Sequence, residues 1–336
     1  MTSVVGLAVS EVRPETDEVS TIVFDDRDRW VGGRAGQHIV LHVRIDDVEH
    51  RRVYSLSSSP ELGEQPAITV KRLSGGTVSP FLVERIGPGD VIDVEPAAGV
   101  FTLDVGADNR RTYYGFIAGS GSVPVLSMTK SILAREPESN VHLAYGNRRK
   151  EDVIFSEALA ALGEQYPGRL SLTHALSSEG SRIDHRFVND FLMGHPPASL
   201  DVRYLVSGPP GMRDGVVARL ASLGVLDAHV LVEHYLPPTR SDGPEPYDGA
   251  IVSDLTSGVS AAIPAGETVL TGMASAGAPV EWACQSGVCG TCRAKLISGE
   301  VDPGFPFVLT EQDRTDGFIL TCIARPVSPE VVVDLG

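Results

Sequence analysis

The chain has few cysteines and a deficit of positive charge, and both shortages narrow what it can do. Only four of its 336 residues are cysteine, and 28 basic residues stand against 44 acidic ones, which gives a formal net charge of −16. Because a negative surface repels phosphate groups, we expect neither nucleic-acid binding nor binding to anionic membranes. A surface charged for solubility is the simpler explanation of the acidic excess, although such a surface can also steer a basic protein partner.

The sequence also lacks a long apolar run. No stretch approaches the roughly 18 residues that a membrane span requires, and the first residues show no basic region followed by an apolar one. We therefore expect a cytosolic protein without a membrane span. Structural disulfides are rare in the cytosol, so four cysteines, three of them between positions 284 and 292, predict a metal or redox centre.

The length predicts several domains, since single cores stop growing at roughly 250–300 residues. Residues 1–108 contain short β-branched runs such as "HIVLHVRI" and "AITVKRL" between turn residues, which predict an antiparallel barrel or sandwich. Residues 109–236 alternate strand-like and helical stretches, which predict a parallel, doubly wound α/β sheet. Residues 237–248 are rich in Pro, Gly and Asp and predict a linker, and residues 249–336 form a third module.

The cysteine spacing is the most specific signal in the chain. Cys284, Cys289 and Cys292 follow the pattern C-x4-C-x2-C, and Cys322 comes later, with 322 − 292 − 1 = 29 residues between the last two. This is the plant-type spacing for a [2Fe–2S] cluster, in which four thiolates bind two irons. A structural zinc site is the alternative, but it more often pairs two short C-x2-4-C motifs. The spacing favours the iron–sulfur cluster.

Two glycines in the same loop fit this interpretation. Gly287 and Gly290 allow positive φ angles and a close approach of backbone N–H groups to the sulfides. The loop "CQSGVCGTC" resembles that of the plant-type ferredoxin family, and the similarity extends over residues 249–336. The resemblance implies a β-grasp fold with one main helix for this module.

Two motifs in the first module point to a flavin. "RRVYSLSSSP" contains R-x-Y-S at Arg52, Tyr54 and Ser55, and "ITVKRLSGGTVSPFL" combines two glycines with hydroxyls at Thr77 and Ser79. The second motif can bring backbone N–H groups to a pyrophosphate. Together with "RAGQ" and "PAAGVF", these motifs resemble the flavin domain of the ferredoxin–NADP reductase superfamily.

The resemblance implies a role for each matching residue. Tyr54 is expected to pack on the isoalloxazine ring, Arg52 to neutralise phosphate charge and Ser55 to bond the polar edge of the flavin. It implies FAD rather than FMN, because "SLSSSP" and "PAAGVF" look like the FAD-binding members. The other residues that we expect to bind the flavin are Val70, Lys71, Gly75, Gly76, Thr77, Val78 and Ser79.

A glycine motif in the second module points to a nicotinamide cofactor. "IAGSGSVPVLSM" follows an apolar strand and precedes a helix, so Gly119, Ser120 and Gly121 can admit a pyrophosphate to the helix N-terminus. Pro124 lies near the first helical turn, where a missing N–H costs little. A short G-x-G is weak evidence alone, and its position and neighbours strengthen it. The superfamily usually has Thr before the proline, where this chain has Val123.

Two further segments of the second module match the superfamily. "VSGPPGMRDGV" resembles its C-G-P motif, with Ser207 in place of the cysteine, followed by Gly208 and Pro209. In the family this position lies beside the nicotinamide and helps to align hydride transfer. "VLVEHY" places Glu233 and Tyr235 at the family's acidic-x-aromatic position near the flavin, although an aromatic residue that closes a sheet edge is nearly as good an explanation. The residues that we expect to act in the reaction are Tyr54, Ser55, Ser207 and Tyr235.

The choice between NADPH and NADH stays open. "YGNRRKED" follows the second strand of the module, where Arg148, Arg149 and Lys150 could pair a 2′-phosphate or form a solvated turn. The basic run favours NADPH over NADH.

Flavin, nicotinamide and cluster modules in this order resemble the reductase components of bacterial multicomponent oxygenases, most closely the phenylacetyl-CoA epoxygenase reductase and 3-ketosteroid 9α-hydroxylase reductase type. The resemblance implies electron transfer from NADPH or NADH through FAD and a [2Fe–2S] cluster to a terminal oxygenase, hydroxylase or desaturase. Two alternatives remain: a stand-alone flavin reductase or diaphorase, and a zinc-stabilised interaction module without catalytic activity.

Overall fold

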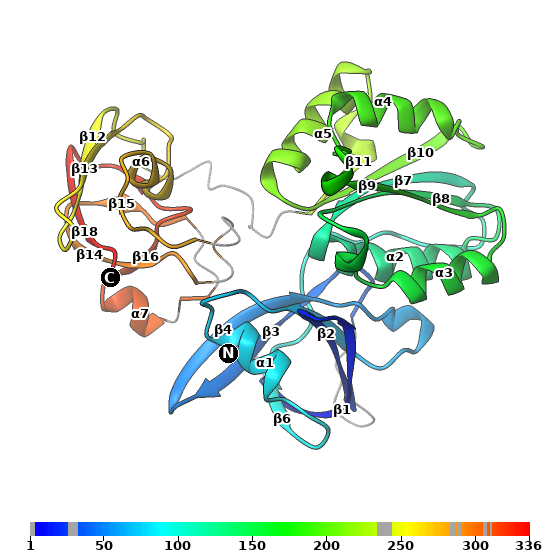
Figure 1. The fold of residues 1–336 in the computed structure, drawn as a ribbon, viewed down its shortest axis with the longest axis horizontal. Helices are drawn as coiled ribbons and strands as arrows, with labels where there is room; N and C mark the ends of the chain where they lie inside the picture. The colour runs from blue at the N-terminus through cyan, green and yellow to red at the C-terminus, as the bar shows by residue number, and fades with distance from the viewer. Residues whose placement is uncertain are drawn as a thin grey trace. The chain divides into compact units, whose positions relative to one another are not determined.

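The computed structural model describes residues 4–25, 33–233, 244–282, 287, 290–304, 308–309 and 311–336. The chain divides into two compact units. The first comprises Met1–His42 and Tyr54–Glu233, and the second comprises Val43–Val53 and His234–Gly336. Figure 1 shows the sheets and helices of each unit.

An antiparallel sheet of six strands forms the N-terminal part of the chain, with strand order β4-β3-β6-β1-β2-β5. A bridge between Leu56, just after β4, and Ile68 of β5 joins the two edges, so the sheet closes into the predicted barrel. The run "HIVLHVRI" becomes β3 and buries Ile39, Leu41 and Val43 at the period of two that a strand imposes. The elements are β1 (Val5–Thr16), β2 (Val19–Asp25), β3 (His38–Ile45), β4 (Val48–Ser55), η1 (Pro60–Leu62), β5 (Ala67–Lys71), α1 (Val78–Glu84) and β6 (Val91–Val94).

A parallel sheet of five strands follows, with strand order β11-β10-β7-β8-β9. Helices α2 and α3 cover one face and α4 and α5 cover the other (Figure 1), so the doubly wound prediction is confirmed. Because both faces are covered, the strands read as nearly continuous apolar runs. The elements are β7 (Arg111–Ala118), η2 (Gly119–Gly121), α2 (Ser122–Arg135), β8 (Asn140–Asn147), η3 (Lys150–Asp152), α3 (Ser156–Gln165), β9 (Leu170–Leu176), η4 (Ser177–Glu179), α4 (His185–Gly194), β10 (Asp201–Ser207), α5 (Pro210–Ser222), η5 (Asp227–His229) and β11 (Val230–Val232).

A row of hydroxyl groups joins the barrel to the parallel sheet within the first unit. The Ser127 hydroxyl on α2 donates to the carbonyl oxygen of Ser58, and the hydroxyls of Ser59 and Ser131 share a hydrogen bond of 2.5 Å. All four residues are almost fully buried. Since buried hydroxyls need partners, these bonds fix how the segment after β4 faces α2.

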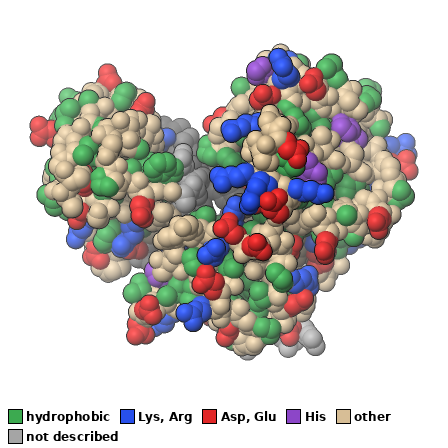
Figure 2. Space-filling model, viewed as in Figure 1, with side chains coloured by type: hydrophobic (Ala, Val, Ile, Leu, Met, Phe, Trp, Pro, Cys, Tyr) green, Lys and Arg blue, Asp and Glu red, His purple; other side chains and the backbone are tan. Residues whose placement is uncertain are grey.

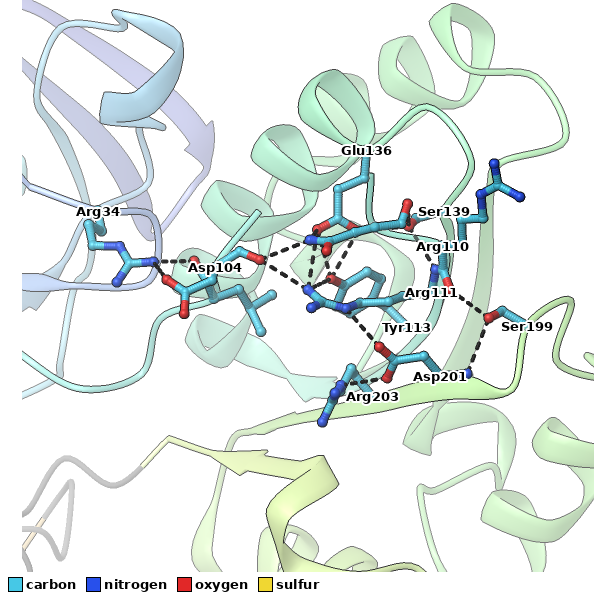
Figure 3. A network of polar contacts seen from close by, with 12 residues as sticks. Arg34, Asp104, Arg110, Arg111, Tyr113, Glu136, Ser139, Ser199, Asp201 and Arg203 are labelled. Carbon is cyan, nitrogen blue, oxygen red and sulfur yellow. Dashed lines mark hydrogen bonds and ion pairs between the residues drawn. The ribbon is translucent and has the colours of Figure 1, made fainter. Parts of the chain in front are cut away.

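A buried carboxylate, Glu136, ties together the amino end of the parallel sheet (Figure 3). Both of its oxygens lie 3.0 Å from the Tyr113 hydroxyl, and they accept hydrogen bonds from Asn109 at 2.6 Å and Ser139 at 2.7 Å. The Arg111 guanidinium lies 3.5 Å away. Burial raises the pKa of Tyr113, so its hydroxyl stays protonated and available as a donor. These donors offset the cost of burying the charge.

The second unit contains a mixed five-stranded sheet, with strand order β13-β12-β18-β14-β16, and one parallel pair, β12 with β18. Helix α6 packs closely on β13, because a Cβ at Gly272 would lie 2.5 Å from Ile263 Cγ1. A mixed sheet with one main helix is the predicted β-grasp. The elements are β12 (Ala250–Asp254), β13 (Ser260–Ile263), α6 (Val269–Ser275), β14 (Arg293–Ser298), β15 (Val301–Asp302), α7 (Glu311–Thr315), β16 (Phe318–Leu320), β17 (Arg325–Pro326) and β18 (Glu330–Asp334).

The predicted domain boundaries, at 1–108, 109–236, 237–248 and 249–336, stay predictions, and the first part of the expected linker lies outside the described residues. In the part of the chain that the structure describes, no helix has the length and apolar character to cross a membrane.

Candidate functional site

Three side chains from distant segments meet at the carboxyl end of the parallel sheet. Glu233 directly follows β11, Ser207 ends β10 and Ser55 ends β4. The Ser55 hydroxyl donates to Glu233 Oε1 at 3.0 Å, and the Ser207 hydroxyl donates to Oε2. Ser55 is 7% exposed, Ser207 0% and Glu233 5%. One buried carboxylate thus links the predicted flavin segment to the predicted nicotinamide segment.

The glycine loop after β7 packs against Ser207. A Cβ at Gly121 would lie 2.4 Å from the carbonyl oxygen of Ser207, so only glycine permits this approach. Gly119 has a φ of +51°, and apart from its chain neighbours no atom of the described residues lies within 4 Å of the position that its Cβ would take. Ser120 lies between them, and the loop leads into α2, where Pro124 is buried. The loop is therefore open on the side where a pyrophosphate would approach the helix N-terminus.

Tyr145 on β8 supports this loop. Its hydroxyl lies 2.9 Å from Ser122 Oγ, and the Ser122 hydroxyl donates to the Gly119 carbonyl oxygen at 2.9 Å. Burial raises the pKa of Tyr145 to about 12. At the end of the same strand, the buried Nδ2 of Asn147 has no acceptor among the described residues. An unsatisfied donor at this edge fits a bound cofactor with oxygen acceptors.

The segment after β10 brings a second turn to the same edge. Gly208 has a φ of +155°, and a Cβ there would lie 3.2 Å from the backbone nitrogen of Ala118 at the end of β7. Pro209 follows, and α5 begins at Pro210. The predicted Ser207, Gly208 and Pro209 thus lie beside the glycine loop. Their contact with a nicotinamide stays a prediction.

The predicted flavin residues lie on β4, β5 and the turn that leads to α1. Tyr54 is half-buried on β4, and the Leu56–Ile68 bridge brings the end of β4 beside β5. On β5, Val70 is buried and Lys71 is exposed. Arg52 is half-buried on β4, and its Nη1 donates to the carbonyl oxygen of the preceding residue at 2.8 Å.

The turn before α1 fits a phosphate group in part. Gly75 has a φ of +75°, and in the part of the chain that the structure describes no atom beyond its chain neighbours lies within 4 Å of its Cβ position. Gly76 and Thr77 follow it towards the buried Val78. The Ser79 hydroxyl, however, accepts the backbone N–H of Leu73 at 3.0 Å. We conclude that Ser79 closes the turn, so backbone N–H groups are the better candidates for phosphate binding.

Two of the four predicted cluster cysteines are described, and they lie together. Cys292 is 4% exposed, Cys322 is 6% exposed, and both belong to one apolar cluster. The backbone N–H of Thr321 donates to the Cys292 carbonyl oxygen at 3.0 Å. This hydrogen bond brings the segments of Cys292 and Cys322 together. Gly287 and Gly290 have φ angles of +72° and +75°, as predicted. Two soft sulfur donors that lie together and two positive-φ glycines fit an iron–sulfur cluster. Cys284 and Cys289 lie outside the described residues.

The two arginines of the basic run after β8 differ in whether their guanidinium groups form ion pairs. Arg149 is paired with Glu151 at 3.1 Å and Asp152 at 3.0 Å. Arg148 is exposed, and its backbone oxygen accepts the N–H of Ser178 from the loop after β9 at 2.9 Å. Of the predicted arginines, Arg148 is thus the one whose guanidinium makes no hydrogen bond or ion pair with another described residue.

Sequence reasoning missed several residues of this site. The contacts of Glu233, and the support from Tyr145, Ser122 and Asn147, depend on the carboxyl ends of separate strands meeting at one edge. The signal that could have found them is their position at strand ends in a parallel sheet. Tyr235 lies outside the described residues.

Three protein-family models match the chain in the predicted order. An oxidoreductase FAD-binding domain matches residues 9–103, an oxidoreductase NAD-binding domain residues 116–218 and a 2Fe-2S iron–sulfur cluster binding domain residues 252–327. FAD, a nicotinamide cofactor and a [2Fe–2S] cluster are therefore the cofactors, and the zinc alternative has no support.

Curated relatives match along the whole chain. One polypeptide of the 1,2-phenylacetyl-CoA epoxidase from Escherichia coli (strain K12) is 31% identical over 99% of this chain and 98% of its own length. The ferredoxin reductase component of 3-ketosteroid-9-alpha-monooxygenase from Rhodococcus rhodochrous is 33% identical over 98% and 96%. The solved structure of phthalate dioxygenase reductase shares the fold, with a TM-score of 0.61 and 23% identity over 99% of this chain and 98% of that one. The resemblance inferred from the motifs is confirmed, and the chain belongs to the family of oxidoreductases that join FAD-binding and NAD-binding domains to a C-terminal 2Fe-2S domain.

Proposed function

We propose that this oxidoreductase is the reductase component of an oxygenase system and delivers electrons from NADPH to a terminal oxygenase. Two observations together support the proposal. The chain matches proteins of named oxygenase systems over nearly its full length. In addition, Ser55 and Ser207 both donate hydrogen bonds to Glu233. A stand-alone flavin reductase would not need the C-terminal cluster module. A desaturase is a second class of acceptor that the relatives do not name.

The residues of the site have separable tasks. FAD supplies hydride acceptance and single-electron release when it is bound, and a [2Fe–2S] cluster carries single electrons. Ser55 and Ser207 present hydroxyls at the flavin and nicotinamide segments, and Glu233 holds both of them in place. Burial of the three groups excludes water and keeps their geometry fixed. In this site the role of the protein is to position the reacting groups.

The proposal of NADPH rests on Arg148. A guanidinium pairs well with a phosphate, and Arg148 is exposed at the carboxyl edge of the sheet, where an adenosine would lie. Arg149 is already paired with Glu151 and Asp152 and adds less. Replacement of Arg148 by Ala should lower kcat/KM for NADPH and leave kcat/KM for NADH nearly unchanged.

The proposal of a basic protein acceptor rests on charge. Residues 249–336 contain ten acidic and four basic residues, so 10 − 4 leaves an excess of six negative charges. Figure 2 shows acidic side chains dispersed over the face of the second unit that is in view. Opposite charges speed encounters between proteins, and salt screens them. A rate of partner reduction that does not change with ionic strength would contradict this part of the proposal.

An anaerobic titration tests the function. NADPH and then NADH are added to the purified protein, visible absorption is followed, and EPR is recorded on the reduced sample. We expect flavin bleaching, loss of cluster absorbance and a rhombic S = 1/2 signal, with NADPH the better titrant. A colourless protein, even after reconstitution, would contradict the proposal and favour a zinc-stabilised module.

Transfer to a purified oxygenase separates the reductase component from a stand-alone enzyme. Ferricyanide and free quinones accept electrons from both, so turnover with them decides nothing. We expect NADPH-dependent product formation only when oxygenase and reductase are both present. Equal rates with small acceptors but no transfer to any oxygenase encoded nearby would favour the stand-alone reductase.

A further inference from the structure

An exposed tryptophan, Trp282, lies two positions before the first predicted cluster cysteine in the sequence. Trp282 is 50% exposed, although tryptophan is highly buried on average. Two residues earlier, Val280 is 8% exposed and packs in the same apolar cluster as Cys292 and Cys322. The chain therefore leaves this core and directs Glu281 and Trp282 outward, since both are exposed.

Trp282 lies close along the chain to the predicted cluster ligands. Trp282 comes two residues before Cys284, the first predicted cluster ligand. Two residues of fully extended chain span at most about 7 Å between Cα atoms. This limit holds for any path of the loop, so an exposed aromatic side chain lies within about two residue lengths of a cluster ligand.

The chemistry of this surface fits one kind of partner. Tryptophan is enriched among the residues that dominate binding energy at protein interfaces, and redox encounters bury little area, so a single anchor weighs heavily. The exposed carboxylate of Glu281 adds negative charge beside the indole, within a module that has an excess of six negative charges. A partner surface that complements these two residues has an apolar pocket with a basic rim.

We propose that Glu281 and Trp282 form the docking surface for the electron-accepting protein, which receives the indole in an apolar pocket rimmed by Lys and Arg. This inference rests on the proposed function, because it identifies where the acceptor binds. The rest of the second unit contributes charge, and Trp282 contributes the apolar anchor.

The test uses full-length protein with its cofactors and a basic cytochrome c as the probe. The dissociation constant for oxidised cytochrome c is measured by calorimetry at low ionic strength, and KM is measured for its NADPH-supported reduction. Trp282→Ala should raise both about 30-fold, as loss of a hot-spot residue does. Glu281→Gln should raise them less and weaken their salt dependence. The EPR signal and the rate of cluster reduction by NADPH should not change.

Leu255→Ala is the matched control. Leu255 is 59% exposed and belongs to the same unit, but it is not among the residues that pack with Cys292 and Cys322. Its replacement should leave the dissociation constant within twofold of the wild type. Trp282→Phe keeps an aromatic ring, should give an intermediate value, and replaces the alanine variant if that variant fails to fold.

Two results would overturn the docking surface. One is a Trp282→Ala protein that binds and reduces cytochrome c like the wild type. The other is slower cluster reduction by NADPH with unchanged cytochrome c binding, which would assign the indole to transfer within the chain. Failure of the proposed function can be distinguished from failure of the docking surface. A wild-type protein without flavin and cluster signals would refute both proposals before any variant is made.

Discussion

Two buried glutamates lie at opposite ends of the parallel sheet and have different surroundings. Glu136, at the amino end, is 0% exposed and accepts hydrogen bonds from Tyr113, Asn109 and Ser139, with the Arg111 guanidinium 3.5 Å away. All these residues lie between positions 109 and 139. Glu233, at the carboxyl end, is 5% exposed and accepts one serine hydroxyl on each oxygen, from segments 178 and 26 residues away.

We propose from this difference that Glu136 serves the fold and that Glu233 serves the reaction. Donors from one continuous stretch fix Glu136, so its removal leaves a set of buried donors without an acceptor. The donors of Glu233, Ser55 and Ser207, come from the parts of the chain that match the FAD-binding and NAD-binding domain models. We expect substitution of Glu136 to change stability and substitution of Glu233 to change the rate of hydride transfer.

The largest effect is expected for Glu136→Ala. It removes the shared acceptor of Tyr113, Asn109 and Ser139 and should lower the free energy of unfolding by about 3–5 kcal/mol. Urea unfolding followed by circular dichroism measures this. Flavin reduction by NADPH, measured well below the unfolding midpoint, should stay within twofold of the wild type. A stability loss below about 1 kcal/mol, the size of a single ordinary hydrogen bond, would contradict the assigned role.

Glu233→Gln should give the next largest effect, and on rate. The amide keeps one acceptor oxygen but replaces the other with a donor, so the two serines can no longer both donate. Loss of alignment at a reacting centre can cost on the order of 100-fold in rate. Stopped-flow absorbance measures flavin reduction, and the free energy of unfolding should fall by less than about 2 kcal/mol. A wild-type rate of flavin reduction together with a large loss of stability would show that Glu233 serves the fold and not the reaction.

Substitution of Ser207 tests one half of this contact, at a position where the motif that the segment resembles has cysteine. Ser207→Ala removes one hydrogen bond to Glu233, worth about 1 kcal/mol, and should slow flavin reduction about fivefold. Ser207→Cys restores a weak donor and should give a rate between the alanine variant and the wild type. Both rates come from the same stopped-flow assay, and equal rates for all three proteins would show that this contact is dispensable.

The smallest effect is expected for Arg34→Gln. Arg34 pairs with Asp104 at the edge of the Glu136 network (Figure 3), but the two side chains are 45% and 95% exposed. Exposed ion pairs contribute about 0–1 kcal/mol. Urea unfolding should show a loss within that range, decreasing at high salt. A loss as large as that of Glu136→Ala would mean that exposure does not decide which contacts matter here.

The sequence allowed the larger elements and the cofactor motifs to be predicted. The strands "HIVLHVRI" and "AITVKRL" and the helix that begins near Pro124 are local patterns, and the structure confirms them. Strand β1 and helices α1 and α4 were missed. β1 alternates weakly and α1 overlaps the motif assigned to phosphate binding, whereas α4 has an amphipathic pattern that was not recognised. Local pattern alone does not show which surfaces become buried.

The polar contacts could not be predicted for a different reason. Glu136 looks like an ordinary surface glutamate in sequence, and Glu233 was expected near the flavin only from the resemblance. The burial of both depends on segments that meet only in the folded chain. The Ser55–Glu233 contact spans 178 residues. By contrast, the [2Fe–2S] prediction needed only the spacing of four cysteines, because that spacing is specific by itself.

The most direct test of the account is the rate of flavin reduction by NADPH in anaerobic stopped-flow, compared between wild type, Glu136→Ala and Glu233→Gln at one temperature below all unfolding midpoints. We predict a rate within twofold of the wild type for Glu136→Ala and about 100-fold lower for Glu233→Gln, with bound flavin confirmed by its absorbance in each protein. Equal rates for Glu233→Gln and wild type would contradict the claim that the contact of Ser55, Glu233 and Ser207 belongs to the reaction.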